Sequence, residues 1–346
     1  MPALAVAEEL AARGARVSFV TTPALLESVA ARYPAFPLAM RGFERRLVTF
    51  ENVRTVTQLI AAMPRSWRLL SKVRPAAVIG GGGYVSGPVV ALAAMRGITA
   101  VALESDSHLG VTNRLLRPFA RRVCLSFPIA GLEPPKYVVT GRPLAGAQVS
   151  ATREQGFAAF ELSADLPVLL VFGGSQGARS LNQACLEAFA RPDLELQVVH
   201  VCGPRNHDEV RAELLRRGAP LERYKLVAYT DRLAAAMAAA TLIVARSGGS
   251  VAEIAALGKP AVLVPYPYAS ADHQRKNAEW MTAAGAAVMV ADADLTGERL
   301  RGLVSELLGD PERLARMAAA SHAIGRPDAR LRVVDELQAL LERKTA

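Results

Sequence analysis

The chain has 346 residues, of which 51% are hydrophobic and 21% charged, a composition that excludes a disordered protein and allows two domains. Three scattered cysteines and five histidines argue against a disulfide framework and against a zinc enzyme. The net charge of +9 is uneven, because residues 1–150 carry 18 Lys and Arg against 8 Asp and Glu, whereas residues 151–346 carry 23 against 24.

The first half alternates short apolar runs with helical periods, the pattern of a parallel sheet wrapped by helices. Thr57–Arg74 predicts an amphipathic basic helix with a break or kink at Pro64, either on a membrane surface or against the core. The uncharged run Ala76–Met95 is long enough to span a bilayer, but its glycines predict a strand, a loop and a helix instead. The predicted strands are Val17–Thr21, Ala77–Gly80, Ala100–Glu104, Val123–Ser126 and Tyr137–Thr140.

The second half repeats this alternation after a Gly/Pro break at Gly141–Leu144, which we interpret as an interdomain hinge. Its predicted strands are Val168–Phe172, Gln197–Cys202, Lys225–Tyr229, Leu242–Ala245, Ala261–Pro265 and Ala287–Val290. Helices are predicted at Glu298–Leu308, Pro311–Ala320 and Asp328–Glu342. The sequence therefore predicts two α/β domains.

A glycine-rich segment follows a buried strand in each half of the chain. Gly80–Gly83 and Gly173–Gly177 each lead from a strand into a helix. Such a loop offers unpaired N–H groups and the positive end of a helix dipole to an anion such as a diphosphate. The alternative is a tight strand-to-helix turn without a ligand. Neither loop has the GxGxxG spacing, which argues against a nicotinamide dehydrogenase.

Three polar segments of the second half lie at predicted helix starts. In Arg246–Glu253, Ser250 and Glu253 have the spacing of a capping box, although Glu253 could equally accept hydrogen bonds from both hydroxyls of a ribose. Asp272–Asn277 could bond sugar hydroxyls or begin a solvated helix. Asp292-Ala293-Asp294 precedes a helix, and helix-start capping is favoured over metal binding there.

Taken in order, these motifs resemble the MurG family, the undecaprenyl-diphospho-muramoylpentapeptide β-N-acetylglucosaminyltransferases of peptidoglycan synthesis. The resemblance covers nearly the whole chain and rests on the motifs Gly82–Pro88, Glu104–Asp106 with Gly110–Asn113, Gly173–Arg179, and Arg246–Gly248 followed by Glu253. It implies two Rossmann-like domains of the GT-B type facing a cleft. These would be residues 1–142 and 143–325, with a C-terminal helix within 326–346 packing back on the first domain.

By the family pattern the second domain binds UDP-N-acetylglucosamine (UDP-GlcNAc) and the first binds lipid I. Glu253 would take the ribose, the backbone at Tyr229-Thr230 the uracil, and Gln274 the sugar hydroxyls. The donor-binding residues implied are Asp106, Ser175, Gln176, Gly177, Thr230, Arg246, Ser247, Gly248, Gly249, Ser250, Glu253 and Gln274. The acceptor-binding residues implied are Gly82, Gly83, Tyr84 and Ser86.

The reaction implied is displacement of UDP from C1 of N-acetylglucosamine by the C4 hydroxyl of the muramoyl sugar, with inversion, which yields lipid II. Helix N-termini would stabilise the negative charge that develops on the departing diphosphate. A carboxylate or imidazole must take the acceptor proton, and the candidates are Glu104, Asp106 and His108.

The resemblance also sets expectations about cofactors and partners. No metal or other cofactor is expected, since UDP-GlcNAc is a substrate. The basic first half and the 5% aromatic content favour an anionic membrane surface over nucleic acid, with a solvated basic face as the alternative. The expected place is the cytoplasmic face of the cell membrane, as a peripheral protein, with other cell-wall synthesis proteins as candidate partners.

The sequence departs from the family pattern at its start. Members place a strand and a glycine-rich loop ending in His directly before the residues that match Pro2–Ala7. We therefore expect the first domain as given to lack its first strand, one acceptor loop and that histidine, and we expect a mis-called start codon or a truncated gene model. Leu103 also replaces the His common before Glu104, and Ala145 stands where an Arg usually follows the hinge.

Other functions fit the same architecture. A UDP-sugar 2-epimerase would share the twin domains, but it should carry additional catalytic carboxylates and a histidine in the first domain. A catalytically impaired remnant that binds a UDP-sugar without turnover would follow from the expected missing loop. A glycosyltransferase with a small soluble acceptor would share the donor motifs.

Overall fold

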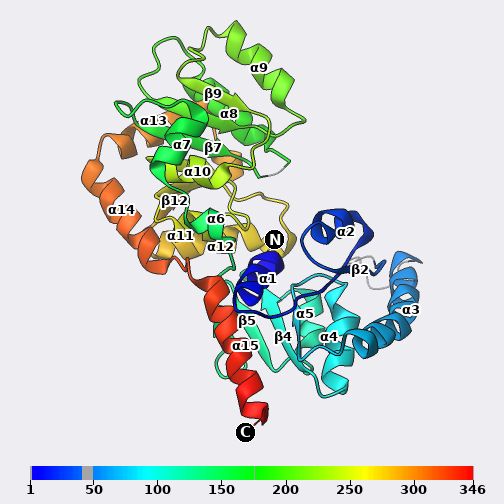
Figure 1. The fold of residues 1–346 in the computed structure, drawn as a ribbon. Helices are drawn as coiled ribbons and strands as arrows, with labels where there is room; N and C mark the ends of the chain where they lie inside the picture. The colour runs from blue at the N-terminus through cyan, green and yellow to red at the C-terminus, as the bar shows by residue number, and fades with distance from the viewer. Residues whose placement is uncertain (1, 41–49, 175, 346) are drawn as a thin grey trace. The chain divides into compact units, whose positions relative to one another are not determined.

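The structure, a computed structural model, describes residues 2–40, 50–174 and 176–345. It divides into two compact units, each with its own parallel sheet layer and helices (Figure 1). The first unit combines Met1–Ala145 with Asp328–Ala346, and the second is Gly146–Pro327. The chain therefore passes from one unit to the other twice, three residues after the first predicted boundary and two residues after the second.

The second unit is built on a six-stranded parallel sheet in the order β12-β11-β10-β7-β8-β9. The central strands are uninterrupted apolar runs, as expected for strands covered by helices on both faces. All residues of β7 and β10 are buried. The strands are β7 (Val168–Phe172), β8 (Gln197–Val201), β9 (Tyr224–Val227), β10 (Leu242–Ala245), β11 (Ala261–Leu263) and β12 (Ala287–Met289).

The helices of the second unit connect these strands and pack on both faces of the sheet. Leu181 and Leu186 of α8 lie in one core cluster with Val171 of β7. The helices are α6 (Gly146–Val149), α7 (Arg153–Phe160), α8 (Arg179–Phe189), α9 (His207–Arg216), α10 (Leu233–Ala239), α11 (Val251–Ala256), α12 (His273–Ala283), α13 (Gly297–Leu308) and α14 (Pro311–Ile324), with 3₁₀ turns η1 (Ser270–Asp272) and η2 (Asp292–Asp294).

The first unit contains a four-stranded parallel sheet, β3-β4-β5-β6, and a separate parallel pair, β1-β2. Val20 of β1 and Val78 of β3 pack against one core cluster, which also contains residues of α3 and α4. The strands are β1 (Phe19–Thr21), β2 (Ala35–Pro37), β3 (Ala77–Gly80), β4 (Thr99–Glu104), β5 (Arg122–Leu125) and β6 (Tyr137–Val139). The helices are α1 (Pro2–Ala12), α2 (Pro23–Ala30), α3 (Phe50–Val73), α4 (Ser86–Met95), α5 (Val111–Leu116) and α15 (Ala329–Thr345).

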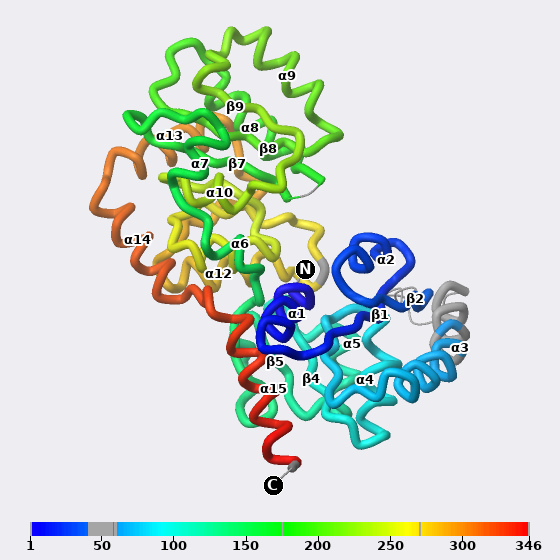
Figure 2. The backbone as a smooth tube through the Cα atoms, in the orientation of Figure 1, coloured from blue at the N-terminus to red at the C-terminus, as the bar shows by residue number. Residues whose placement is uncertain are grey.

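The first and last helices of the chain pack together in the first unit (Figure 2). Val6 of α1 and Val334 and Leu337 of α15 form one buried cluster with Leu103 of β4. Arg13 adds an ion pair of 2.6 Å to Asp335. Both ends of the sequence therefore contribute to the same core.

The predicted α/β fold with parallel sheets is confirmed, with two local differences. Sequence reasoning missed β2, which has three residues beside Pro34 and so has no detectable alternation. Of the predicted break or kink at Pro64, the break is wrong, because α3 continues through the proline, and the kink stays a prediction. Ala62 and Leu70, on either side of the proline, are both buried in the core, and this packing offsets the roughly 3 kcal/mol that an interior proline costs. Among the described residues, no helix has the length and apolarity needed to cross a membrane.

Candidate functional site

The loop after β7 lies at the carboxyl edge of the second sheet, where open α/β sheets bind their ligands. Its residues Gly173 to Gly177 lead into α8, whose N-cap residue Ala178 makes no side-chain capping hydrogen bond. The first N–H groups of an α-helix have no intrahelical partner, so this eleven-residue helix begins with donors available to an anion. Gln176 is exposed on the loop, and Ser175 lies outside the described residues.

Gly177 rests directly on the turn that follows β8. A Cβ atom placed on Gly177 would lie 2.1 Å from the carbonyl oxygen of Cys202, and the residue has a φ of +75°. Both the space and the backbone conformation therefore require glycine. The position of the glycine loop thus depends on where the Cys202 carbonyl is held.

Arg246, predicted to contact the donor, is a buried clamp. Its side chain is 8% exposed and forms a 2.7 Å ion pair with Asp292. The guanidinium also donates to Ser180 Oγ at 2.7 Å and to the carbonyl oxygens of Val264 and Pro265 at 3.2 Å each. Through these interactions Arg246 joins the ends of β10 and β11 to α8 and η2, and its predicted contact with the donor stays a prediction.

Asp292 is the partner of that clamp, and the prediction that Asp292-Ala293-Asp294 caps the next helix is wrong. Thr296 caps α13 by accepting a hydrogen bond from the Arg299 N–H at 3.1 Å. Asp292 instead accepts from Arg246 and from the Ser180 hydroxyl, the latter at 2.7 Å. The buried guanidinium of Arg246 thus binds the Asp292 carboxylate, which the local sequence predicts as a cap of α13.

The segment after β10 is fixed to the start of α12. Ser247 is fully buried, and its hydroxyl donates to the Gln274 carbonyl at 2.7 Å, while its predicted contact with the donor stays a prediction. The Gln274 amide oxygen accepts from the Tyr266 N–H at 3.0 Å, and a Cβ on Gly248 would lie 3.9 Å from Gln274 Nε2. The predicted sugar-binding amide and the Gly248 backbone are therefore neighbours.

The predicted capping box of α11 is absent. Ser250 occupies the N-cap position, but its side chain makes no capping hydrogen bond, because its backbone is already helical at φ −63° and ψ −16°. Gly249 precedes it, and Glu253 lies in the first helical turn, partly exposed. Thr230 follows β9, and its hydroxyl oxygen accepts from the Arg232 N–H at 3.0 Å, which fixes the turn there.

The predicted acceptor loop joins β3 to α4 in the first unit. The Ser86 hydroxyl donates to the Gly83 carbonyl at 2.7 Å and so closes the loop on itself. Gly82 lies in the same loop, and the Tyr84 side chain is 37% exposed. Because the hydroxyl hydrogen of Ser86 is used internally, this loop offers an anion its backbone N–H groups and the Tyr84 hydroxyl rather than the Ser86 hydroxyl.

Glu104, one of the three catalytic candidates, holds a loop. Its side chain is buried at the end of β4 and accepts hydrogen bonds from the Gly110 N–H and Asn113 Nδ2 at 2.9 Å and from the Asp106 N–H at 3.2 Å. These three hydrogen bonds join the Glu104 side chain to the segment that follows β4, and its catalytic role stays a prediction. Asp106 and His108, both half-buried, lie on the loop that Glu104 holds, and the Nδ1 atom of His108 is buried.

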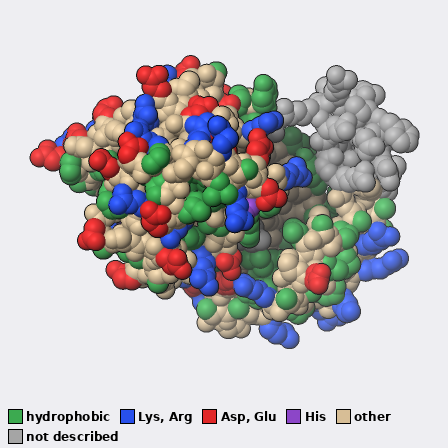
Figure 3. All heavy atoms as spheres, turned by 90° about the horizontal axis from the view of Figure 1, so that it is seen from above, with side chains coloured by type: hydrophobic (Ala, Val, Ile, Leu, Met, Phe, Trp, Pro, Cys, Tyr) green, Lys and Arg blue, Asp and Glu red, His purple; other side chains and the backbone are tan. Residues whose placement is uncertain are grey.

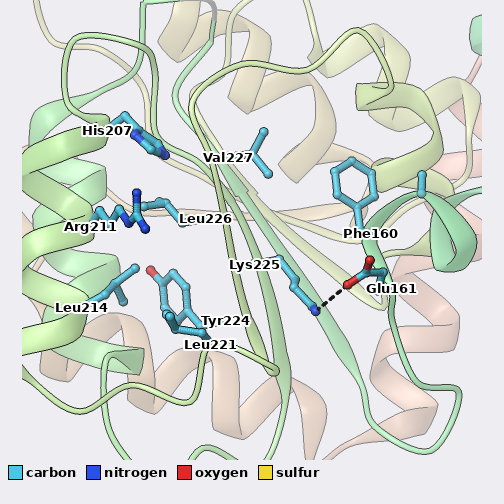
Figure 4. A pocket seen from close by; sticks show the side chains of 11 residues that line it. Phe160, Glu161, His207, Arg211, Leu214, Leu221, Tyr224, Lys225, Leu226 and Val227 are labelled. Atoms are coloured by element: carbon cyan, nitrogen blue, oxygen red, sulfur yellow. Dashed lines mark ion pairs between the residues drawn. The ribbon is translucent and has the colours of Figure 1, made fainter.

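A separate cavity of about 470 Å³ opens beside β9 in the second unit (Figure 4). It is lined from α9 by His207 and Arg211, and from β9 by Lys225, which pairs with Glu161 at 3.6 Å. None of the predicted donor residues lines it. It is therefore distinct from the residues that are predicted to bind the donor.

The sequence did not predict the buried residues that hold Arg246 and the Ser247 carbonyl in place. Ser180 and Asp292 hold Arg246, and Asn277 donates to the Ser247 carbonyl at 3.1 Å. Asn182 and Asn277 are buried on helices, at 3% and 0% exposure. A buried amide on an otherwise apolar helix face is the signal that would have marked the two asparagines.

The comparisons with known proteins agree on a family. Models of the glycosyltransferase family 28 N-terminal and C-terminal domains match residues 1–125 and 168–333. A UDP-N-acetylglucosamine--N-acetylmuramyl-(pentapeptide) pyrophosphoryl-undecaprenol N-acetylglucosamine transferase of Moorella thermoacetica is 38% identical, over 95% of this chain and 92% of the relative. The crystal structure of Acinetobacter baumannii MurG is similar with a TM-score of 0.77 at 28% identity, over 98% of this chain and 95% of that one. A UDP-GlcNAc 2-epimerase from Neisseria meningitidis shares the fold at 15% identity and a TM-score of 0.65, over 94% of this chain and 91% of that one.

Proposed function

Because this chain belongs to glycosyltransferase family 28, we propose that it transfers N-acetylglucosamine from UDP-GlcNAc to the muramoyl sugar of lipid I, forming lipid II. The observation that carries the proposal is the 38% identity, across both units, to a transferase named for this reaction. The carboxyl edge of the second sheet supports it, because the N–H groups at the start of α8 follow β7 there and the Gln274 amide lies beside Gly248, which follows the neighbouring strand β10.

The donor would bind to the second unit. The diphosphate would meet the N–H groups at the start of α8, and the Gln274 amide beside Gly248 would meet the sugar. Glu253 would accept hydrogen bonds from the ribose hydroxyls, and the backbone near Thr230 would meet the uracil. Donors fixed before the reaction stabilise the charge of the departing diphosphate without reorganising, and removing one such donor from an active site typically costs a factor of roughly 100 to 1,000 in rate.

The acceptor would bind to the first unit, with its diphosphate at the loop between β3 and α4. The C4 hydroxyl of the muramoyl sugar would displace UDP from C1 with inversion. Asp106 is the favoured proton acceptor, because Glu104 is buried and occupied by three hydrogen bonds. An Asp106→Asn variant is expected to keep UDP affinity and lose turnover.

We further propose that the reaction needs no resident metal ion. Asp292, the first carboxylate of the Asp-x-Asp motif, is committed to Arg246 and Ser180 and so is occupied by a cation of the protein itself. The expected result is that EDTA leaves the transfer rate unchanged within about twofold. Loss of activity in EDTA that Mg²⁺ restores would contradict this proposal.

A stripe along α5 and the turn that follows it supports peripheral attachment of the first unit to an anionic membrane. Val111, Leu115 and Phe119 are spaced four residues apart and are 54%, 62% and 38% exposed. Arg114 and Arg117 are exposed between them. Figure 3 shows Lys and Arg side chains beside apolar ones on the visible part of the first unit. Apolar residues flanked by cations are the combination that binds the surface of anionic bilayers.

Vesicle sedimentation tests the membrane proposal. Leu115→Glu is expected to weaken binding to phosphatidylglycerol vesicles by roughly tenfold, since burial of a leucine contributes about 1.5–3 kcal/mol. The matched control is Leu215→Glu, a leucine of α9 that is 57% exposed on the second unit. Equal binding of the two variants would refute the assignment of the stripe.

A UDP-release assay with and without lipid I tests the transferase proposal. Acceptor-dependent release is expected, whereas an epimerase would isomerise the sugar without an acceptor and a binding remnant would bind UDP without turnover. Glu253→Gln is expected to weaken UDP affinity roughly tenfold, the magnitude of a charge-assisted hydrogen bond. Glu298→Gln, an exposed glutamate in the first turn of α13, is the control. Unchanged affinity in Glu253→Gln would remove that residue from the site.

A further inference from the structure

We propose that His200 is a positioning residue for donor binding, acting through a buried chain of hydrogen bonds that holds the turn beneath the glycine loop. The inference rests on the proposed function, because it assumes that the loop at Gly174–Gly177 binds the donor diphosphate. His200 lies in β8 and is fully buried.

This network of hydrogen bonds connects three elements of the second unit. Tyr224, the first residue of β9, has its hydroxyl 2.9 Å from His200 Nδ1. His200 Nε2 lies 3.0 Å from Asn182 Oδ1, on α8. Asn182 Nδ2 then donates to the Cys202 carbonyl at 2.9 Å. Cys185 of α8 lies 3.1 Å from the Tyr224 hydroxyl and ends the chain on its far side.

The Cys202 carbonyl, at one end of this hydrogen-bond network, determines the direction of the other hydrogen bonds. Since the Cys202 carbonyl can only accept, Asn182 must present its NH₂ group there and its oxygen to His200. His200 therefore carries its hydrogen on Nε2 and accepts the Tyr224 hydroxyl hydrogen at Nδ1. Complete burial lowers the pKa of His200 to about 3, which keeps the ring in this neutral form. The Cys185 thiol then donates to the tyrosine oxygen.

The Cys202 carbonyl, which this hydrogen-bond network holds in place, supports the glycine loop. A Cβ on Gly177 would lie 2.1 Å from the Cys202 oxygen, and a Cβ on Gly203 would lie 2.6 Å from the Gly177 Cα and N atoms. Asn206 Nδ2 gives the Cys202 carbonyl a second hydrogen bond at 3.2 Å. Because the space between these segments is too small even for a Cβ atom, we infer that a displacement of the Cys202 carbonyl displaces Gly177 and with it the N–H groups at the start of α8.

Substitutions at two residues separate this role from general stability. Asn182→Asp keeps the volume and the acceptor for His200 but places a carboxylate oxygen against the Cys202 carbonyl. His200→Leu removes both ring nitrogens, whereas His200→Gln retains one acceptor and one N–H donor. The control is Gln197→Leu at the opposite end of β8, where Gln197 is 3% exposed and bonds Ser163 and Leu166.

Calorimetric titration with UDP and steady-state kinetics with UDP-GlcNAc test the proposal. Asn182→Asp and His200→Leu are expected to raise the Kd for UDP and the KM for UDP-GlcNAc roughly tenfold with a smaller change in kcat, and His200→Gln to recover most of the loss. Gln197→Leu should lower the urea midpoint without changing the Kd. If His200→Leu does not fold, Asn182→Asp decides the matter.

The outcomes separate the two levels of the argument. If Asn182→Asp and His200→Leu fold and bind UDP as tightly as the wild type, the positioning role is overturned and the proposed function stays intact. A Gln197→Leu variant that loses as much affinity as Asn182→Asp would also overturn it, because the effect would then be a general loss of stability. A wild-type protein that does not bind UDP would instead refute the proposed function.

Discussion

Removal of the Asp292 carboxylate tests whether Arg246 is a structural clamp. Truncating one partner of a buried ion pair typically costs 3–5 kcal/mol, because the other charge stays buried without compensation. Here the Arg246 side chain is 8% exposed, but Asp292 is 22% exposed, and the guanidinium keeps its bonds to Ser180 and two carbonyls. We therefore expect Asp292→Ala to lower the free energy of unfolding of the second unit by about 2 kcal/mol, below the buried-pair range.

The assay follows urea unfolding of the second unit alone. Trp280 lies in α12 of that unit and Trp67 in α3 of the other, so a Trp67→Phe background restricts the fluorescence signal to Trp280. With a slope of about 2 kcal/mol per molar urea, the midpoint should fall by about 1 M. Asp292→Asn, which keeps one acceptor oxygen, should show a smaller shift.

Asp294→Ala is the matched control for the same motif. Asp294 is 58% exposed and lies 3.8 Å from an exposed Arg299, a pair that contributes little in water. Its removal should change stability by less than about 0.5 kcal/mol. Equal destabilisation by the two alanine variants would refute the clamp, because it would mean that the aspartates act as a pair.

Three further predictions follow from buried polar groups. Glu104→Gln should lower kcat/KM for the acceptor about tenfold or more while leaving UDP affinity unchanged, because an amide cannot accept all three N–H groups of the loop; equal loss of UDP affinity would contradict this. Since burial holds the pKa of His200 at about 3, the unfolded chain takes up the proton first as the pH falls. The free energy of unfolding should therefore fall by about 1.4 kcal/mol per pH unit between about pH 6.5 and 3. Urea midpoints measured across this pH range should lack this dependence in His200→Gln, which has no imidazole. Burial raises the pKa of Cys124 and of Cys185 to about 12, so iodoacetamide at about pH 8 should leave both thiols unmodified in the native protein, as checked by mass spectrometry; rapid alkylation would refute their burial.

The strands and the glycine loops could be predicted from the sequence because their signals are local. β7 and β10 are uninterrupted apolar runs, and their predicted bounds agree with the structure. The glycines between β7 and α8 follow one another in the sequence, so their position at a strand end was readable. By contrast, β2 has three residues and no periodicity of its own, and only its pairing with β1 defines it.

The roles of the charged residues could not be predicted in the same way. Arg246 and Asp292 are 46 positions apart, and nothing near either one indicates that they meet. Their motif neighbours suggested a donor contact and a helix cap, which are the local uses of these residue types. Glu104 is likewise of a residue type that can act as a catalytic base. Only the structure shows that three N–H groups donate to its carboxylate. Ser175 lies outside the described residues, so its predicted contact with the diphosphate stays a prediction.

The packing of the seventeen-residue α15 against α1 has a consequence for how the polypeptide is assembled on the ribosome. Domains commonly fold in the order in which they are synthesised. Here Val6, in the unit that begins first, gains its partners Val334 and Leu337 only after the inserted unit has been synthesised. The inserted unit, Gly146–Pro327, is fully synthesised before that point and can fold while the earlier segment still exposes part of its core to chaperones.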